Sequence, residues 1–181
     1  MEGGASGRHS YGYTGRMYEA DYLGSIPVTP VYEQRLTALA RGRTTKDGGP
    51  YISFEDGVRL AKEFQPWDPT NPEKELSREL RLAVIEALDI SEDQLDRVRV
   101  YTAVNSPLDR LHRVDAFLEF DDPTSRQTLR VTIDLTKNPL KAGEEGIVET
   151  EALTHLVVGE LPDPEHPGFL PLVAEVAAAT A

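Results

Sequence analysis

The segment RVDAFLEFDDPTSRQTLRVTIDLTKNP, residues 113–139, decides how the second half of the chain is expected to fold. Apolar and polar residues alternate over 113–120 and again over 128–136, and a polar turn containing a proline separates the two. Alternation with a period of two predicts strands, and the short polar connection predicts that they pair as an antiparallel hairpin. Each strand carries a carboxylate, Asp115 or Asp134, at a position where a strand that only builds a sheet does not need one.

The sequence around this hairpin predicts an α/β domain. Apolar residues at helical spacing predict a helix that begins at Asn71-Pro72 and ends near Leu88. Alternating segments over 97–104 and 153–161 predict two more strands, and the apolar C-terminal residues predict a closing helix. The order of elements is therefore α-β-β-β-(short α)-β-α. It predicts a single domain whose central mixed sheet has four strands and flanking helices.

The first 70 residues are expected to form a helical extension of this core. Residues 1–17 are rich in Gly, Ser and Tyr without a period, which is typical of a flexible arm or of one that orders against a partner. Between residues 18 and 70 we expect a short helix over 30–40 and a second helix capped by Ser53. The predicted organisation is a flexible arm over 1–17, a helical N-terminal extension over 18–70 and a core over 71–181.

Composition excludes several classes of protein. The chain has no cysteine, which rules out disulfides, thiolate metal sites and a cysteine nucleophile. It has no run of about 18 apolar residues, so no membrane span is expected. The first residues lack the apolar core of a signal peptide, and we expect a cytoplasmic protein, or a virion-associated one if its origin is a phage.

Charge is distributed unevenly along the chain. The net charge of −12 argues against a protein that binds nucleic acid over its whole surface. The block that contains the hairpin, 97–141, has eight basic and six acidic side chains and is the net-positive part of the sequence. Residues 142–181 have eight acidic side chains and no Lys or Arg. This acidic segment is either a solvated face or a surface for a basic partner.

The two carboxylates of the hairpin are expected to lie close together. If the strands pair about the turn, residues whose numbers sum to about 248 lie opposite each other, and Asp115 and Asp134 sum to 249. Their Cβ atoms would then be about 5 Å apart, where like charges destabilise a hairpin. A divalent cation would offset the repulsion. Salt bridges from Arg113 and Arg130, which share the faces of the two acids, would do so without any function.

The order of elements, together with SPLDRLHRVDAFLEF and VTIDLTKNP, resembles the PD-(D/E)XK nuclease-like superfamily. The resemblance covers about residues 72–160. It implies that Asp115 is the first metal-binding aspartate and Asp134 the second acid, and that the two hold Mg²⁺ or Mn²⁺. It also implies that Glu79, or else Glu86, is the auxiliary acid of the first helix.

The sequence departs from the pattern of this superfamily at the lysine. The pattern places a lysine two residues after the second acid, and that position is Thr136. Lys137 is three residues after Asp134 and starts on the opposite face of the strand. It would turn inward only if the strand ends or bulges there, as the following Asn138-Pro139 allows.

The resemblance implies metal-dependent hydrolysis of nucleic-acid phosphodiesters. In this mechanism the metal activates a water molecule and neutralises charge on the phosphate, and Lys137 positions the water or stabilises the transition state. The catalytic set would thus be Asp115, Asp134, Lys137 and Glu79. Arginines near the acids would hold flanking phosphates; these are Arg110, Arg113, Arg126 and Arg130.

Two neighbouring residues have two interpretations each. Asp109 is either a turn or helix-cap aspartate or an acid that reaches the site from the loop before the strand. His112 is either a surface residue or a proton carrier beside the site.

The sequence leaves other functions open. The chain can be a non-catalytic interaction or assembly protein of phage or mobile-element type on the same fold, binding a protein partner through the Tyr-rich arm or the acidic C-terminal segment. The displaced lysine and the acid excess favour this alternative. A third option, a small acidic inhibitor that mimics nucleic acid, requires acids clustered on one exposed face, and the net-positive central block argues against it.

Overall fold

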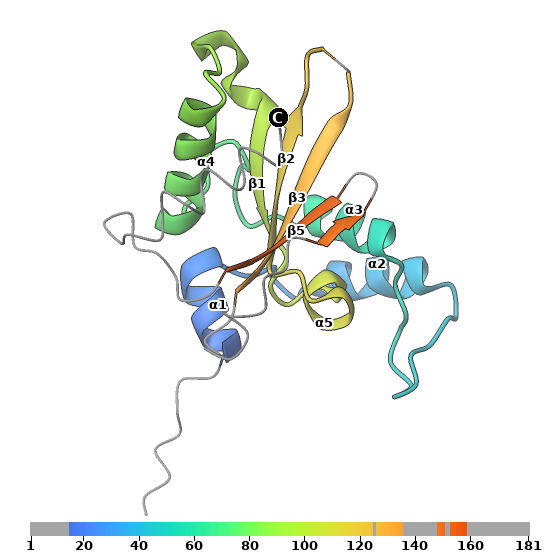
Figure 1. The fold of residues 1–181 in the computed structure, drawn as a ribbon. Helices are drawn as coiled ribbons and strands as arrows, with labels where there is room; N and C mark the ends of the chain where they lie inside the picture. Colours follow the sequence, from blue (N-terminus) through green and yellow to red (C-terminus); the bar gives the residue numbers. More distant parts are fainter. Residues whose placement is uncertain (1–14, 125, 136–147, 151–152, 159–181) are drawn as a thin grey trace, which may run out of the picture.

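The computed structural model describes residues 15–124, 126–135, 148–150 and 153–158 (Figure 1). Lys137, Thr136, most of the N-terminal arm and the C-terminal helix expected from the sequence lie outside these residues. The described residues form helices and a β-sheet, so the expectation of an α/β protein holds for this part of the chain.

Five strands form one mixed sheet in the order β1-β2-β3-β5-β4. The first three are antiparallel, β5 runs parallel to β3, and β4 is antiparallel to β5. Four strands were expected, and β4 is the additional one. The strands are β1 (Val98–Thr102), β2 (Ala116–Asp121), β3 (Thr128–Leu135), β4 (Val148–Thr150) and β5 (Leu153–Val158).

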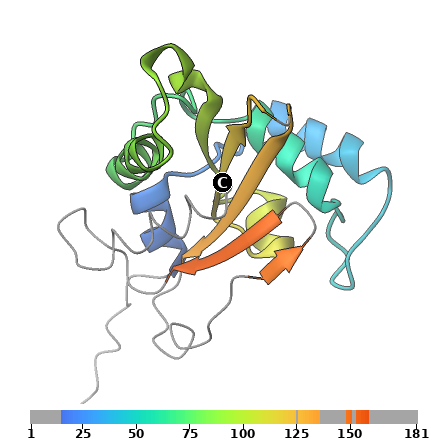
Figure 2. The ribbon, with the colours of Figure 1, turned by 45° about the horizontal axis from the view of Figure 1, so that its top comes forward.

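The helices cover both faces of the sheet (Figures 1 and 2). Helices α1 and α4 pack on one face, whereas α2, α3 and α5 pack on the other. Within the described ranges, every helix is too short or too polar to span a lipid bilayer. The helices are α1 (Gly15–Leu23), α2 (Pro30–Ala40), α3 (Phe54–Glu63), α4 (Glu75–Ala87) and α5 (Pro107–His112), with a 3₁₀ helix, η1, over Glu92–Arg97.

The alternation of the hairpin divides its side chains between two cores. On β2, Leu118 lies in the core under α4, and Phe117 lies in the core under α2, α3 and α5. The β2–β3 register pairs residues whose numbers sum to 249, for example Glu119 with Arg130. The hairpin predicted from the sequence is therefore present with the expected register.

Side-chain oxygens cap three of the helices at their N-termini. Thr29 accepts a hydrogen bond from the backbone N–H of Tyr32, which starts α2, and Ser53 accepts from that of Asp56, which starts α3. Ser106 accepts from the N–H of Leu108 and starts α5. Each cap satisfies a backbone donor that has no partner within its helix.

Helix α5 was not predicted, and it shortens the second predicted strand. The expected strand over 113–120 begins instead at Ala116, because Arg113 adopts a left-handed conformation with φ of 56° and ends α5. The signal was present: Ser106-Pro107 followed by Asp109 is a cap, a proline at the first helical position and an acid in the first turn.

The outer edge of β1 is covered by the loop that follows α3. The side-chain amide of Gln65 imitates a strand, since its Nε2 donates to the carbonyl of Thr102 at 2.8 Å and its Oε1 accepts from the N–H of Thr102 at 3.0 Å. The N–H of Val100 donates to the carbonyl of Pro69 at 3.0 Å. These contacts satisfy edge groups that would otherwise invite another strand to pair.

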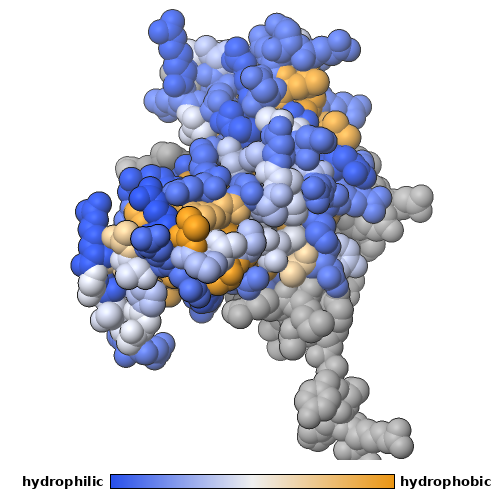
Figure 3. All heavy atoms as spheres, turned by 180° about the vertical axis from the view of Figure 1, so that it is seen from behind, coloured by the Kyte–Doolittle hydropathy of each residue, from blue (hydrophilic) through white to orange (hydrophobic). Residues whose placement is uncertain are grey.

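Figure 3 shows the rear face, where hydrophobic side chains reach the surface among hydrophilic ones. Large hydrophobic residues that the structure leaves exposed include Val28 and Val31 near the start of α2, Tyr51 after the loop that follows α2, and Leu111 of α5. Single exposed apolar residues are common on protein surfaces.

Gly24 is required by the close approach of Trp67. Its φ is +69°, and a Cβ at this position would overlap the six-membered ring of Trp67. Its carbonyl also accepts a hydrogen bond from the hydroxyl of Thr102 at 3.1 Å, which ties the end of α1 to β1. Gly42 has a similar φ of +75°, but a Cβ there would meet nothing within 4 Å.

We predict that Gly24→Ala destabilises the protein more than Gly42→Ala. The matched variant Gly42→Ala carries only the cost of a left-handed alanine, about 1–2 kcal/mol. Gly24→Ala adds the overlap with the indole, for a total of about 3 kcal/mol. Urea denaturation followed by Trp67 fluorescence measures both, and equal losses for the two variants would contradict the close packing.

We also predict a pH-dependent contribution from Asp56. Its buried carboxylate accepts from the hydroxyl of Ser53 at 2.8 Å and pairs with Arg43 and Arg59. The Ser53 hydrogen bond and the two arginines lower the pKa of Asp56 below its ordinary 3.8. The stability that depends on this carboxylate is therefore present above pH 3.8 and is lost as the pH falls through the lower pKa of the folded state.

The measurement is the free energy of unfolding of wild type and Asp56→Asn at several pH values. The difference between them should be largest near neutral pH and should shrink below about pH 4. A difference that does not change with pH would show that the charge of Asp56 contributes nothing beyond its hydrogen bonds.

Candidate functional site

Three acidic side chains from distant parts of the sequence meet at one end of the sheet. They are Glu19 of α1, Asp109 of α5 and Asp115, which precedes β2, and we call them the acidic triad. One carboxylate oxygen of each lies within 4.8 Å of the others. Asp115 is 3% exposed, while the other two are half-buried. Figure 1 shows α1 and α5 together at the end of the sheet where β2 begins.

Local structure holds two members of the triad in place. The Oδ2 atom of Asp109 accepts a hydrogen bond from the backbone N–H of Asn105 at 2.8 Å, which orients it in the first turn of α5. The backbone of Asp115 bridges the two neighbouring strands, because its carbonyl accepts from Ala103 at 2.7 Å and its N–H donates to Ile133 at 2.9 Å. Asp115 therefore has little freedom to move.

Asp134 does not join the triad. Continued by one residue, the β2–β3 register would place Asp115 opposite Asp134, but the N–H of Asp115 bonds to the carbonyl of Ile133 instead. The ladder thus changes register where β2 begins. Asp134 is half-buried on β3 and belongs to no group of three metal-ligating side chains in the described part of the chain.

The triad has the donors that a hard divalent cation prefers. Carboxylate oxygens suit Mg²⁺, Mn²⁺ and Ca²⁺. Ligands on opposite sides of Mg²⁺ lie about 4.2 Å apart, and those of Ca²⁺ about 5 Å apart, because the metal–oxygen distances are about 2.1 and 2.5 Å. The three triad oxygens lie within 4.8 Å of one another, an upper bound close to these spans. A cation there would also offset the mutual repulsion of three carboxylates.

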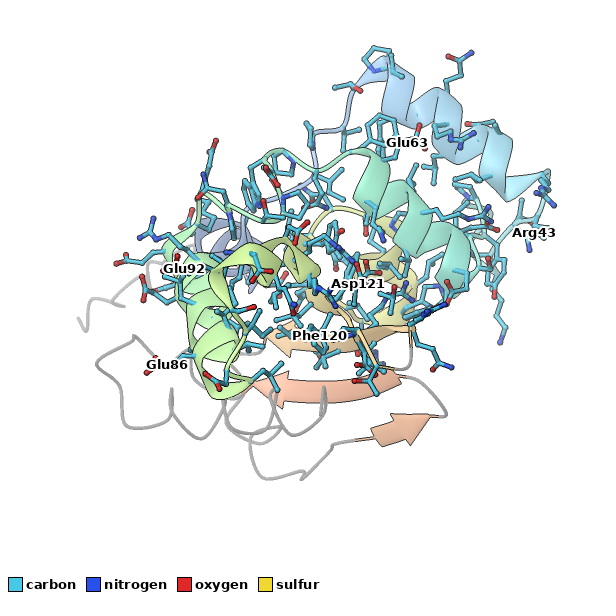
Figure 4. All side chains as sticks on the ribbon, turned by 90° about the horizontal axis from the view of Figure 1, so that it is seen from above. Arg43, Glu63, Glu86, Glu92, Phe120 and Asp121 are labelled. Carbon is cyan, nitrogen blue, oxygen red and sulfur yellow. The ribbon has the colours of Figure 1, made fainter. Side chains whose placement is uncertain are left out.

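The acids that the resemblance assigns to the first helix lie elsewhere. The Oε1 of Glu79 is 3.7 Å from the Nε of Arg78, on the same helix, α4. Glu86 is exposed on α4 (Figure 4). Neither belongs to the triad.

The four arginines expected to hold phosphates occupy different surroundings. Arg110 is exposed, and its Nη2 donates to the carbonyl of Asn105 at 2.9 Å. Arg113 is exposed and lies two residues before Asp115 in the sequence. Arg126 is also exposed and lies in the β2–β3 turn. Arg130 is engaged within the fold, since two of its nitrogens donate to Glu119 at 2.8 and 3.0 Å.

His112 contacts the fold rather than the triad. Its Nε2 lies 3.1 Å from the carbonyl oxygen of Ile52, and its ring packs edge-on against Phe54. These contacts give His112 a structural role in joining α5 to the start of α3. A role as proton carrier remains a hypothesis.

A further carboxylate, Glu119, is fully buried in the middle of β2 and was not predicted as a site residue from the sequence. Arg130 of β3 binds it with two nitrogens, Lys62 of α3 approaches it at 2.6 Å, and Arg99 of β1 lies 3.8 Å away. We call these four residues the Glu119 cluster. The signal was the position of Arg99 and Arg130 opposite Glu119 in the two neighbouring strands, which requires the register to be known.

Aromatic rings and further acids surround the Glu119 cluster. Tyr101 and Phe117 stack with centroids 4.8 Å apart, and Lys62 and Arg130 lie over them, respectively, at 5.3 and 5.8 Å. Burial raises the pKa of the Tyr101 hydroxyl, and the charge of Glu119 adds to this. Arg99 also pairs with Asp121 at 2.7 Å, and this hydrogen bond lowers the pKa of that carboxyl. Figure 4 shows Asp121 beside the sheet, between α3 and α4.

Comparisons of the chain with known protein families, with curated proteins and with solved structures returned no match. The resemblance to the PD-(D/E)XK superfamily therefore stays a hypothesis based on two sequence segments and the order of elements. Function has to be inferred from the chemistry of the described side chains.

We predict that Glu119→Gln destabilises the protein by about 3 kcal/mol, because it leaves three partly buried cations around a neutral amide. Glu55→Gln is the matched control. Glu55 also contacts Arg130, at 3.4 Å, but its side chain is 67% exposed, and its loss should cost less than about 0.5 kcal/mol. Chemical denaturation measures both variants. Similar losses would show that burial does not set the importance of these pairs.

Proposed function

We propose that the protein binds a divalent cation at the acidic triad and acts, as a nuclease-like protein, on nucleic-acid phosphodiesters. The observation that carries the proposal is the convergence of Glu19, Asp109 and Asp115 from three elements, with the most buried of them fixed between two strands. Asp115 is also the residue that the resemblance nominates as the first metal-binding aspartate. Two independent lines of reasoning therefore lead to the same side chain.

The proposed cation is Mg²⁺ or Mn²⁺, with Asp115 as its central ligand. Asp109 and Glu19 complete the protein ligands, in place of the second strand acid, Asp134, that the sequence predicted. When bound, the cation would lower the pKa of a coordinated water and neutralise charge on a phosphate.

The residues of this chain have three tasks in the proposed reaction. Asp115 would hold the cation, and its backbone is bonded to both neighbouring strands. The carboxylate of Asp109 is oriented by the hydrogen bond that its Oδ2 accepts from the backbone N–H of Asn105. Arg113, exposed on the same short segment as the triad aspartates, would bind phosphate oxygens of the substrate.

A second candidate function is a non-catalytic interaction protein. Specific contacts favour it: Arg130 is engaged by Glu119, and Glu79 lies beside Arg78 on the face of the sheet covered by α4. Arg130 is thus held by a buried acid, and Glu79 is a partly exposed side chain of α4 outside the triad. In this reading the acidic triad binds a cation that stabilises the junction of α1, α5 and β2 without catalysing a reaction.

The first experiment is calorimetric titration of Mn²⁺ into wild type and into Asp115→Asn, Asp109→Asn and Glu19→Gln. We predict micromolar to sub-millimolar binding in wild type and at least a tenfold loss in each variant, because each removes a charged ligand from a small site. Glu86→Gln is the matched control, since it removes one exposed carboxylate from α4. Equal binding by all variants, or none by wild type, would contradict the cation site.

Asp134→Asn separates the two arrangements of ligands. If the triad is complete, this variant binds Mn²⁺ as wild type does; a loss of binding would restore the strand acid implied by the resemblance. Incubation with single- and double-stranded DNA and RNA in Mn²⁺ then tests hydrolysis. Cation binding without hydrolysis that depends on Asp115 would favour the interaction protein.

A further inference from the structure

Helix α5 borders a second feature, a hollow on the side away from the sheet. The hollow lies between α2, α5 and the loop over 44–50, and its volume is about 170 Å³. The loop is closed by a backbone bridge between Thr44 and Pro50 and by the N–H of Thr45, which donates to Gly49 at 2.7 Å. The hollow is lined by Leu36, Thr45, Gly49, Pro50, Pro107, Arg110 and Leu111.

The lining of the hollow is mostly apolar and suits one apolar group of a ligand. Carbon atoms from leucine and proline side chains form most of it, and Leu111 is 37% exposed. A cavity of about 150 Å³ lined by such side chains holds a molecule the size of benzene. The hollow is thus large enough for a single aromatic or branched side chain.

One positively charged side chain lies at this apolar lining. Among the lining residues Arg110 is the charged one, and the hydrogen bond from its Nη2 to the Asn105 carbonyl fixes the guanidinium while leaving other donors available. The elements that form the hollow, residues 30–50 and 107–113, carry six basic and three acidic side chains, but Arg35 and Arg43 pair with Glu63 and Asp56 of α3, which leaves a net charge of +1. The basic residues are Arg35, Arg41, Arg43, Lys46, Arg110 and Arg113, and the acidic ones are Glu33, Asp47 and Asp109.

We propose that this hollow binds an acidic peptide segment of a partner protein through one aromatic or branched apolar side chain, with Arg110 pairing with a carboxylate next to it. The apolar lining accounts for the anchor, and the charge of Arg110 at its edge accounts for the carboxylate beside the anchor. A nucleic-acid backbone fits less well, because it has no apolar group to fill the hollow and the lining offers no aromatic ring on which a base can stack. This proposal goes beyond the cation site and does not depend on it.

Gly49 provides a way to close the hollow without disturbing the fold. A Cβ at Gly49 would meet only the Thr45 hydroxyl oxygen, at 3.5 Å, which is an ordinary contact. The backbone at Gly49 therefore accepts a Cβ, and Gly49→Leu adds an apolar side chain at a residue of the lining. Arg110→Gln removes the charge, and Arg78→Gln is its matched control, because Arg78 is an exposed arginine on α4, on the other face of the sheet.

The experiment measures fluorescence anisotropy of a labelled, capped five-residue peptide with one phenylalanine between two pairs of glutamates. EDTA in the buffer removes any cation from the acidic triad, so a failure here is distinct from a failure of the proposed function. We predict a dissociation constant below about 1 mM, a loss of about tenfold or more in Arg110→Gln and in Gly49→Leu, and no change in Arg78→Gln. Circular dichroism and thermal melting verify that each variant is folded.

Two further peptides test the chemistry of the partner. Replacing phenylalanine by alanine removes the anchor, and replacing the glutamates by lysines reverses the charge; both should weaken binding about tenfold or more. The proposal is overturned if the labelled peptide does not bind or if Arg78→Gln weakens it as much as Arg110→Gln. It is also overturned if the alanine peptide binds as well as the original. Self-association of the chain that Gly49→Leu abolishes, without peptide binding, would assign the hollow to a second copy instead.

Discussion

A buried carboxylate in the middle of β2 constrains the arrangement of the elements around it. Glu119 has no exposed surface, and an unpaired charge in such a place is strongly unfavourable. Its partners come from both neighbouring strands and from α3: Arg99, Arg130 and Lys62. A shift of one residue in either strand would turn its arginine to the other face of the sheet and leave Glu119 without that partner. The Glu119 cluster therefore specifies one register among those that the hydrophobic pattern permits.

The same cluster helps to position α3 over the sheet. Lys62 reaches Glu119 from the last turn of α3 and lies over the ring of Tyr101, so its charge and its apolar stem are both used. Asp56, near the start of α3, is held by the Ser53 cap and by Arg43 from the preceding loop. Figure 4 places Arg43 and Glu63 near the two ends of this helix. Both ends of α3 are thus tied to other elements by charged side chains.

The sequence predicted what depends on local pattern, and it did not predict what depends on contacts across the chain. Alternation located β1, β2 and β3, and the β2–β3 register followed from the length of the turn. For Asp109, a place at the site was one of two interpretations from the sequence, but Glu19 could not be derived in this way, because it is nearly one hundred residues from Asp115 and reaches it only once α1 has packed. Helix α5 is the exception, since its local signals were present but were interpreted as part of a strand motif.

Both candidate sites depend on the placement of α5. Adjacent residues on a helix point about 100° apart, so Asp109 can face the acidic triad while Arg110 faces the hollow. The helix has only six residues and cannot hold itself in place. It is fixed by the buried Leu108, which packs so closely on Gly57 of α3 that a Cβ there would lie 3.0 Å from the Leu108 side chain. The chain of contacts from Glu119 through Lys62 and α3 to Leu108 therefore orients the residues of α5 on which both proposals depend.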